Sequence, residues 1–253
     1  QYFTSPLTLN PALTGLTRCD LRMAANYRSQ WGSVSPHPYV TGTVSYDMAT
    51  LKGSLPEGDA LGIGLLGLFD KSGSGALQNT TVGVSLAYHK SFGREKQNTI
   101  SLGVQGYLVQ KSIDFNKLTF EVQFDPSTGT TINVTGETFS NADLTYPDFN
   151  AGIMYTGRLN DYSTAYVGVS YYHIAEPTET FLGGNHTIAP RISATLGGSF
   201  DLNENLVLYT SGLYQQQAKA SELVVGAAAG FVLNPGYDEE FSQKTVLYLG
   251  SWY

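Results

Sequence analysis

The residues of this chain that could carry out catalysis are one glycine-rich run and four histidines. Gly62-Ile-Gly64-Leu-Leu-Gly67 has the spacing of a dinucleotide-binding loop, which needs a preceding strand and a following helix whose N-terminus holds the pyrophosphate. Here the run lies inside an alternating segment that predicts a strand, so we do not expect nucleotide binding. The histidines also lack the spacing to a nucleophile and an orienting group that would indicate a hydrolase; they are His37, His89, His173 and His186.

Metal, cofactor and nucleic-acid sites are not expected either. Cys19 is the single cysteine, so the chain can form neither an intrachain disulfide nor a CxxC metal pair. The net charge of -7 and the scattered Lys and Arg argue against binding to a phosphate backbone. The acidic run Asp238, Glu239 and Glu240 is typical of a solvated turn, with a calcium or partner site as the less favoured interpretation.

The elements that must position any site are strands. From Leu21 to Trp31 apolar residues occupy one parity and polar residues, among them Arg22 and Arg28, occupy the other, so one face of the strand is apolar and the other polar. The same pattern recurs along the chain and predicts about eleven strands. Their ranges are Leu21–Trp31, Tyr39–Met48, Asp59–Asp70, Thr81–Lys90, Ile100–Ser112, Phe149–Arg158, Ala165–Ile174, Ile188–Asp201, Asn205–Gln215, Glu222–Leu233 and Thr245–Tyr253.

The composition favours a membrane barrel over a soluble β-sandwich or propeller. Charged residues make up only 14% of the chain, whereas a soluble domain carries about 25%. No apolar run approaches the roughly 20 residues of a spanning helix. We therefore expect an all-β fold, a transmembrane antiparallel β-barrel integral to the bacterial outer membrane and in contact with lipid. Gln1 in place of an initiator Met fits removal of a signal peptide.

The chain divides into two parts. Residues 1–20 lack strand periodicity and are predicted to form an ordered segment that packs in or under the lumen, while residues 21–253 form the barrel. A turn is expected at Asp70–Gly73 and a polar loop from about residue 113 to 148. Within that loop Leu118–Phe124 and Thr131–Val134 could pair as a hairpin across Pro126–Gly129.

Glycines recur on the more polar, inward parity of the strands. They either ease the curvature of the sheet or leave space in the lumen for a polypeptide segment, for which residues 1–20 are the nearest candidate. The residue types alone leave both interpretations open. These glycines are Gly62, Gly64, Gly83, Gly103, Gly152, Gly168 and Gly197.

A set of short motifs resembles the PorP/SprF-like outer-membrane proteins of the type IX secretion system and gliding machinery, over nearly the whole chain. The motifs include Tyr2-Phe3, Leu9-Asn10-Pro11-Ala12 with Gly15, Asn26-Tyr27-Arg28 with Gln30-Trp31, and Asp70-Lys71-Ser72-Gly73. Weaker support comes from Pro147–Gly152 and Tyr166–Gly168. Each motif is weak alone, but together and in this order they are specific.

The resemblance implies a monomeric outer-membrane barrel that is not an enzyme. Its partners would be the C-terminal region of a type IX cargo, a secreted adhesin, or the periplasmic ring proteins of the machine. The resemblance also implies further strands after Tyr253, which would give a complete barrel of about 14 strands, because single-chain bacterial barrels close with an even number. Motif residues expected to make lumen contacts are Asn10, Pro11, Gly15, Asn26, Arg28, Gln30, Trp31, Asp70, Lys71 and Gly73.

Two functions of different classes follow. The first is a component of type IX secretion or gliding that binds or anchors a secreted adhesin, or binds the periplasmic ring, with an occluded lumen. The alternative is a passive or substrate-specific porin. An outer-membrane enzyme, a third possibility, would need an inward Ser or Asp beside a His near one rim.

Overall fold

The computed structural model describes most of the chain. The described residues are 4–17, 19–35, 37–51, 53–73, 77–115, 118, 123–131, 143–181, 186–234 and 245–253.

Thirteen strands and three short helical turns make up this part of the chain. The helical elements are α1 (Pro6–Leu9), η1 (Pro11–Leu13) and η2 (Arg94–Lys96). The strands are β1 (Leu21–Gln30), β2 (Tyr39–Thr50), β3 (Ala60–Ser72), β4 (Leu77–Phe92), β5 (Asn98–Ile113), β6 (Phe124–Asp125), β7 (Thr130–Thr131), β8 (Asp143–Asn160), β9 (Ser163–Tyr172), β10 (Arg191–Asn203), β11 (Leu206–Gln217), β12 (Ala220–Asn234) and β13 (Thr245–Trp252).

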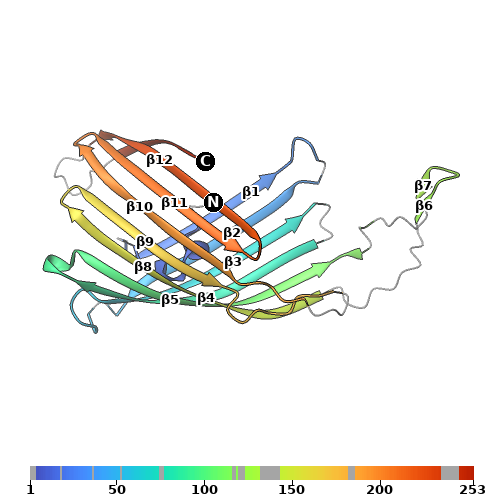
Figure 1. The fold of residues 1–253 in the computed structure, drawn as a ribbon, viewed down its shortest axis with the longest axis horizontal. Coiled ribbons are helices and arrows are strands. Elements are labelled where there is room, and N and C mark those ends of the chain that lie inside the picture. Colours follow the sequence, from blue (N-terminus) through green and yellow to red (C-terminus); the bar gives the residue numbers. More distant parts are fainter. Residues whose placement is uncertain are drawn as a thin grey trace.

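Eleven of these strands form one antiparallel sheet in chain order, from β1 to β5 and then from β8 to β13. The predicted all-β fold of eleven antiparallel strands is thus confirmed. The sheet curls into a trough around α1 and η1 (Figure 1). Within the described residues β1 and β13 each pair with a single neighbour, so the barrel is not closed.

The two faces of the sheet differ as the alternation predicts. On the outer face large apolar side chains are exposed; Met23, Val84 and Leu196 are examples. On the inner face small or polar side chains such as Ser85 and Gln105 are buried. The polar parity therefore faces the concave side of the sheet, where the N-terminal segment lies.

Several strand ends differ from the sequence prediction. β3 continues through the expected turn to Ser72, and Gly73, with φ of +54°, is the first residue beyond it. β8 begins at Asp143 rather than Phe149, because polar side chains such as Asp148 fit the inner face and do not mark a loop. β10 begins at Arg191 rather than Ile188, because Pro190 has no N–H to donate to the ladder.

The hairpin expected within the long loop is described only in part. Phe124–Asp125 pairs with Thr130–Thr131 across the expected turn, forming the small sheet β6–β7, which projects far from the trough (Figure 1). The rest of Leu118–Phe124 and Thr131–Val134, apart from Leu118 and Gln123, lies outside the described residues.

The two rims of the trough carry connections of different length. Residues 114–142 join β5 to β8 and residues 173–190 join β9 to β10; they are the two longest connections and lie on the same rim, which we call the long-loop rim. The opposite rim, which we call the short-turn rim, carries the tight connections 161–162 and 204–205 together with the longer connection 51–59, while the tight turn 218–219 lies on the long-loop rim. Among the described residues no helix has the length and apolar character needed to cross a membrane.

Candidate functional site

The segment from Thr4 to Thr17 folds against the inner face of the sheet. Proline at the first position of both α1 and η1 suits a helix start, where the missing N–H is not needed. Asn10 joins the two turns, and its side-chain Oδ1 accepts a hydrogen bond of 2.9 Å from Ala12 N. The segment is thereby held in a compact shape that a lumen can enclose.

Side chains of the inner face bind the backbone carbonyls that these short turns leave without partners. Gln105 Nε2 donates to Leu7 O at 2.8 Å, and Tyr172 OH donates to Thr8 O at 3.0 Å. In return the Asn10 amide donates to the strand carbonyls of Ile153 and Val169, at 3.2 and 3.3 Å. Because an unpaired buried backbone group costs about 1–3 kcal/mol, these bonds specify where the segment sits.

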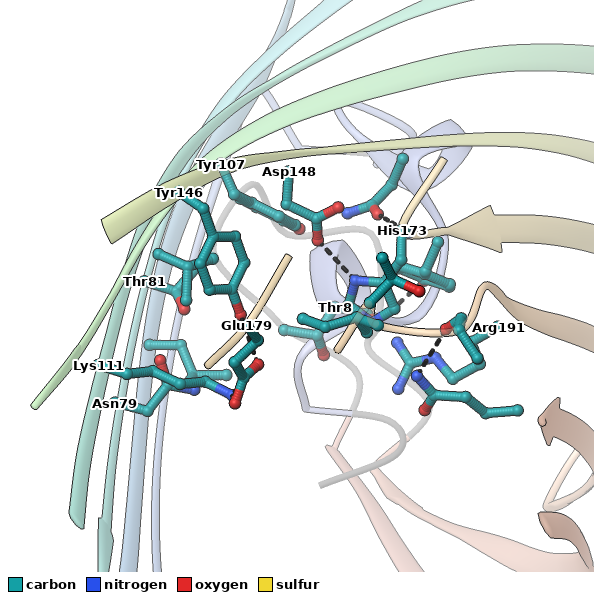
Figure 2. A pocket seen from close by; sticks show the side chains of 18 of the residues that line it. Thr8, Asn79, Thr81, Tyr107, Lys111, Tyr146, Asp148, His173, Glu179 and Arg191 are labelled. Carbon is teal, nitrogen blue, oxygen red and sulfur yellow. Dashed lines mark hydrogen bonds and ion pairs between the residues drawn. The ribbon is translucent and has the colours of Figure 1, made fainter. Parts of the chain in front are cut away.

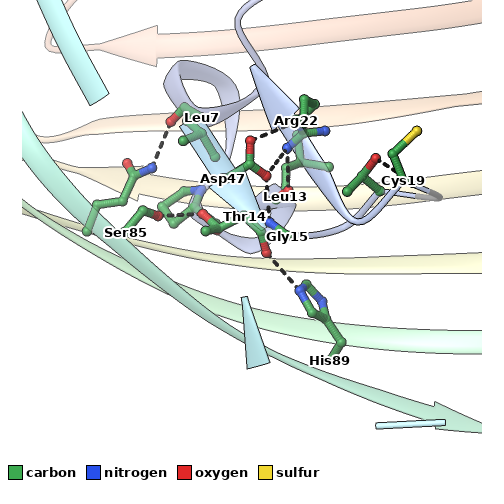
Figure 3. Close-up of polar contacts among 12 residues, drawn as sticks. Leu7, Leu13, Thr14, Gly15, Cys19, Arg22, Asp47, Ser85 and His89 are labelled. Atoms are coloured by element: carbon green, nitrogen blue, oxygen red, sulfur yellow. Dashed lines mark hydrogen bonds and ion pairs between the residues drawn. The ribbon is translucent and has the colours of Figure 1, made fainter. Parts of the chain in front are cut away.

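One ion pair fixes the end of the segment (Figure 3). Asp47 on β2 is fully buried and accepts a hydrogen bond from Gly15 N at 2.7 Å. Arg22 on β1 binds both oxygens of Asp47, at 3.0 and 2.7 Å, and also donates to Leu13 O at 2.8 Å. Nearby, His89 Nε2 lies 2.8 Å from Thr14 O. The Asp47 carboxylate thus joins the N-terminal segment to the first two strands.

Five of the seven inward glycines lie directly against the N-terminal segment. A Cβ at Gly62 would overlap Thr14 O, one at Gly103 would overlap the Pro11 backbone, and one at Gly152 would overlap the Asn10 amide. At Gly64 and Gly168 a Cβ would press on side chains, those of Thr14 and Leu7 at Gly64 and those of Asn10 and Met154 at Gly168. The remaining two glycines, Gly83 and Gly197, face the rings of Tyr107 and Tyr166 instead.

The other sequence-predicted residues divide into two groups. Asn26 Nδ2 reaches the segment, donating to Thr4 O and Ser5 Oγ at 2.7 Å each. Gly15, with φ of +70°, has no room for a Cβ against Gly62. The second group lies nearer the long-loop rim. Its members are Arg28, Gln30, Trp31, Asp70, Lys71 and Gly73; Trp31 is exposed, and Asp70 accepts a hydrogen bond from Thr41.

A cavity of about 620 Å³ lies between the N-terminal segment and the long-loop rim (Figure 2). Thr8 forms its floor, and its walls come from β3, β4, β5, β8, β9, β10, β11 and the 173–190 connection. Arg28 and Asp70 lie on the same cross-strand row as the wall residues Asn79 and Lys111, because the ladder pairs Arg28, Thr41, Asp70, Asn79 and Lys111 in succession.

The carboxylates of the cavity wall already have side-chain partners. Lys111 Nζ contacts both oxygens of Glu179, at 2.6 and 2.7 Å, and Tyr146 OH donates to the same carboxylate at 3.1 Å. Asp148 Oδ2 lies 2.8 Å from His173 Nδ1. Within the described residues no cluster of His, Cys, Asp and Glu has the arrangement of a metal site.

The family model of the type IX secretion system membrane protein PorP/SprF matches residues 1–253. The chain belongs to this family. Comparison with curated proteins finds no significant match. The family identification confirms the resemblance drawn from the motifs, and it assigns this PorP/SprF protein to the membrane components of type IX secretion.

Sequence reasoning missed several residues that hold the segment or line the cavity. Asp47, Gln105 and Tyr172 belong to no motif, whereas Asp148 lies within the motif Pro147–Gly152 but was not named as a site residue; each of the four lies on the inward parity of its strand. The sequence signal that could have identified them is a charged, amide or phenol side chain among the small residues of the inward parity. Two other features named from the sequence lie outside the described residues, the Tyr2-Phe3 motif and the acidic run at 238–240.

If the inward glycines make room for the segment, Gly103→Ala will loosen it and Gly106→Ala will not. Both residues lie on β5, but a Cβ at Gly106 faces outward, 3.6 Å from Phe149, an ordinary contact. The overlap at Gly103 costs about 1–3 kcal/mol, enough to raise hydrogen exchange of residues 4–17 at least severalfold. Heat-modifiable mobility on a gel should show an intact barrel for both variants. Equal protection of the segment in the two variants would assign Gly103 to curvature alone.

Proposed function

We propose that this protein is an integral outer-membrane component of type IX secretion or gliding that binds or anchors a secreted adhesin or other cargo and contacts the periplasmic ring of the machine. Membership of the PorP/SprF family supports a role in the secretion machinery. The observation that carries the binding role is the filled lumen. A segment held by Gln105, Tyr172 and Asp47 obstructs the passage that a porin needs.

The loop lengths support an orientation for this protein in the membrane. Outer-membrane barrels carry short turns on the periplasmic side and longer loops outside. The long-loop rim would then face the exterior, and the N-terminal segment would occupy the part of the lumen nearer the periplasm. A cargo held at the cell surface could reach the cavity, whereas the periplasmic ring would meet the short-turn rim.

The outer face supports the integral location. Val84, in the middle of β4, is 57% exposed, and Leu159, beside the 161–162 turn, is 62% exposed. On a lipid-facing strand an Arg costs about 2–4 kcal/mol at the bilayer midplane and about 0–1 kcal/mol near the interface.

We therefore expect Val84→Arg to lower the free energy of unfolding by about 2–4 kcal/mol, and Leu159→Arg to change it by less than about 1 kcal/mol. The measurement is urea-induced unfolding of the protein in lipid vesicles. The Leu159 variant controls for the loss of an exposed apolar side chain. Equal costs at the two positions would contradict an outer face in contact with lipid.

Planar-bilayer recording separates the binding role from the porin alternative. The N-terminal segment occupies the lumen through backbone and side-chain bonds, so we expect the purified protein to show no steady, large single-channel conductance. Displacing the segment with Gly103→Ala should produce intermittent openings that Gly106→Ala does not produce. A steady, large conductance of the unaltered protein would instead establish a pore.

Affinity purification of the tagged protein, expressed from its native promoter, tests the partners. We expect a secreted adhesin or a periplasmic ring protein of the type IX machine among the co-purified proteins, identified by mass spectrometry. An unrelated outer-membrane barrel with the same tag is the control. Recovery of neither class above this control would count against the proposed function.

A further inference from the structure

Arg191 lines the cavity, and within the part of the chain that the structure describes it has no charged partner. Arg191, the first residue of β10, lies with its guanidinium carbon 4.2 Å from the centre of the Tyr172 ring. Its Nε has no hydrogen-bond partner in the described part of the chain, and there its guanidinium forms no ion pair. The guanidinium also interacts with the Tyr172 hydroxyl, so stacking on this buried ring fixes its plane and leaves Nε as the donor without a partner.

A second unused donor lines the same cavity. The side chain of Asn150 is buried, with 2% of the residue exposed, and its Oδ1 accepts from His173 N at 3.0 Å. Among the described residues its Nδ2 makes no hydrogen bond of normal geometry, although the Tyr107 side chain lies close enough to interact with it. A buried amide donor without a partner costs about 1–3 kcal/mol, so a ligand that supplies an acceptor oxygen recovers that cost.

The two donors lie near one another in the sheet. Arg191 pairs with Tyr172, and Tyr172 directly precedes His173, whose N–H binds Asn150. Both residues line the cavity above Thr8, and Figure 2 shows the Arg191 side chain directed toward the interior. An oxyanion placed there would meet a guanidinium from β10 and an amide from β8, the two strands that flank β9.

The charges of the wall favour a monoanion. Glu179 is neutralised by Lys111, and Asp148 faces His173, so neither carboxylate competes for Arg191. A carboxylate carries half the charge of a doubly charged phosphate, so it experiences less repulsion from Asp148, and its two oxygens match the planar guanidinium with two parallel hydrogen bonds.

We propose that this cavity binds a carboxylate carried by a polypeptide segment, with Arg191 and Asn150 as its hydrogen-bond donors. The proposal rests on the proposed function and names the chemistry by which the cargo is recognised. A volume of about 620 Å³ falls in the usual range of ligand pockets, and Tyr107, Tyr146 and Tyr172 line its wall. The carboxylate could come from the end of a chain or from an acidic side chain.

Binding of synthetic decapeptide libraries to the detergent-purified protein tests the proposal and separates these two sources. The first library lacks Asp and Glu and has free carboxyl ends; the second has the same composition with C-terminal amides; the third contains Glu and has C-terminal amides. We expect the first or the third library to bind at least about tenfold more tightly than the second, because a charge-assisted pair is lost in the second. Equal binding of all three would overturn the proposal, and so would stronger binding of inorganic phosphate than of any peptide.

Variants of Arg191 connect the binding to the cavity. Arg191→Gln should lower the affinity of the preferred library at least about tenfold, and Arg191→Lys should restore only part of it, because ammonium lacks the planar pair of donors. Arg158→Gln, at the short-turn end of β8, is the matched control and should bind as the unaltered protein does. Heat-modifiable mobility verifies that each variant is folded. Undiminished binding by folded Arg191→Gln would overturn the proposal.

The result can be distinguished from a failure of the proposed function. Peptide binding is measured on the isolated protein, whereas the secretion role is measured by co-purification from cells. If co-purification succeeds and carboxylate binding fails, the cargo or ring is held elsewhere and only the cavity assignment is wrong. If no machine component or adhesin co-purifies, the proposed function itself is contradicted, whatever the peptides do.

Discussion

The buried carboxylate of Asp47 is the contact on which the arrangement inside the sheet depends. It accepts a hydrogen bond from Gly15 N and binds Arg22 through both oxygens, and Arg22 also donates a hydrogen bond to Leu13 O. A buried charge is tolerated only when it is paired and hydrogen-bonded, so Asp47, Arg22 and the end of the N-terminal segment require one another. This constraint positions residues 4–17 against β3, β4, β5 and β8, where glycines leave no side chain in the way.

The lumen is therefore divided along its length. The N-terminal segment occupies the part of the lumen beside β2 to β5, β8 and β9, nearer the short-turn rim, and its carbonyls accept hydrogen bonds from strand side chains. The part near the long-loop rim remains a cavity, where Arg191 Nε and Asn150 Nδ2 make no hydrogen bond of normal geometry among the described residues. The glycines beside the N-terminal segment allow it to pack closely against the sheet. The polar groups near the long-loop rim instead surround the cavity. This contrast is what favours a binding role over a conducting one.

Much of the fold could be predicted because apolar and polar side chains alternate along each strand with a period of two residues. The parity of Leu21 to Trp31 predicted both faces of β1, and the eleven strands appeared in the expected order. The beginning of β8 was wrong by several residues, since Asp143 to Asp148 reads as polar loop unless the inner face is known to accept polar side chains. Pro190, by contrast, was a local signal for the beginning of β10 that the alternation hid.

The sequence by itself determined the fold class, the family and the inward position of the glycines, because these depend on periodicity and on motifs that are contiguous in the chain. Only the tertiary structure decided which glycines meet the segment and which meet Tyr107 or Tyr166. It also decided that Arg191, which follows a proline and belongs to no motif, lines the same cavity as Asn150, two strands away in the sheet. Such neighbours come together through the register of the ladder and the curvature of the sheet, which join residues about 40 positions apart.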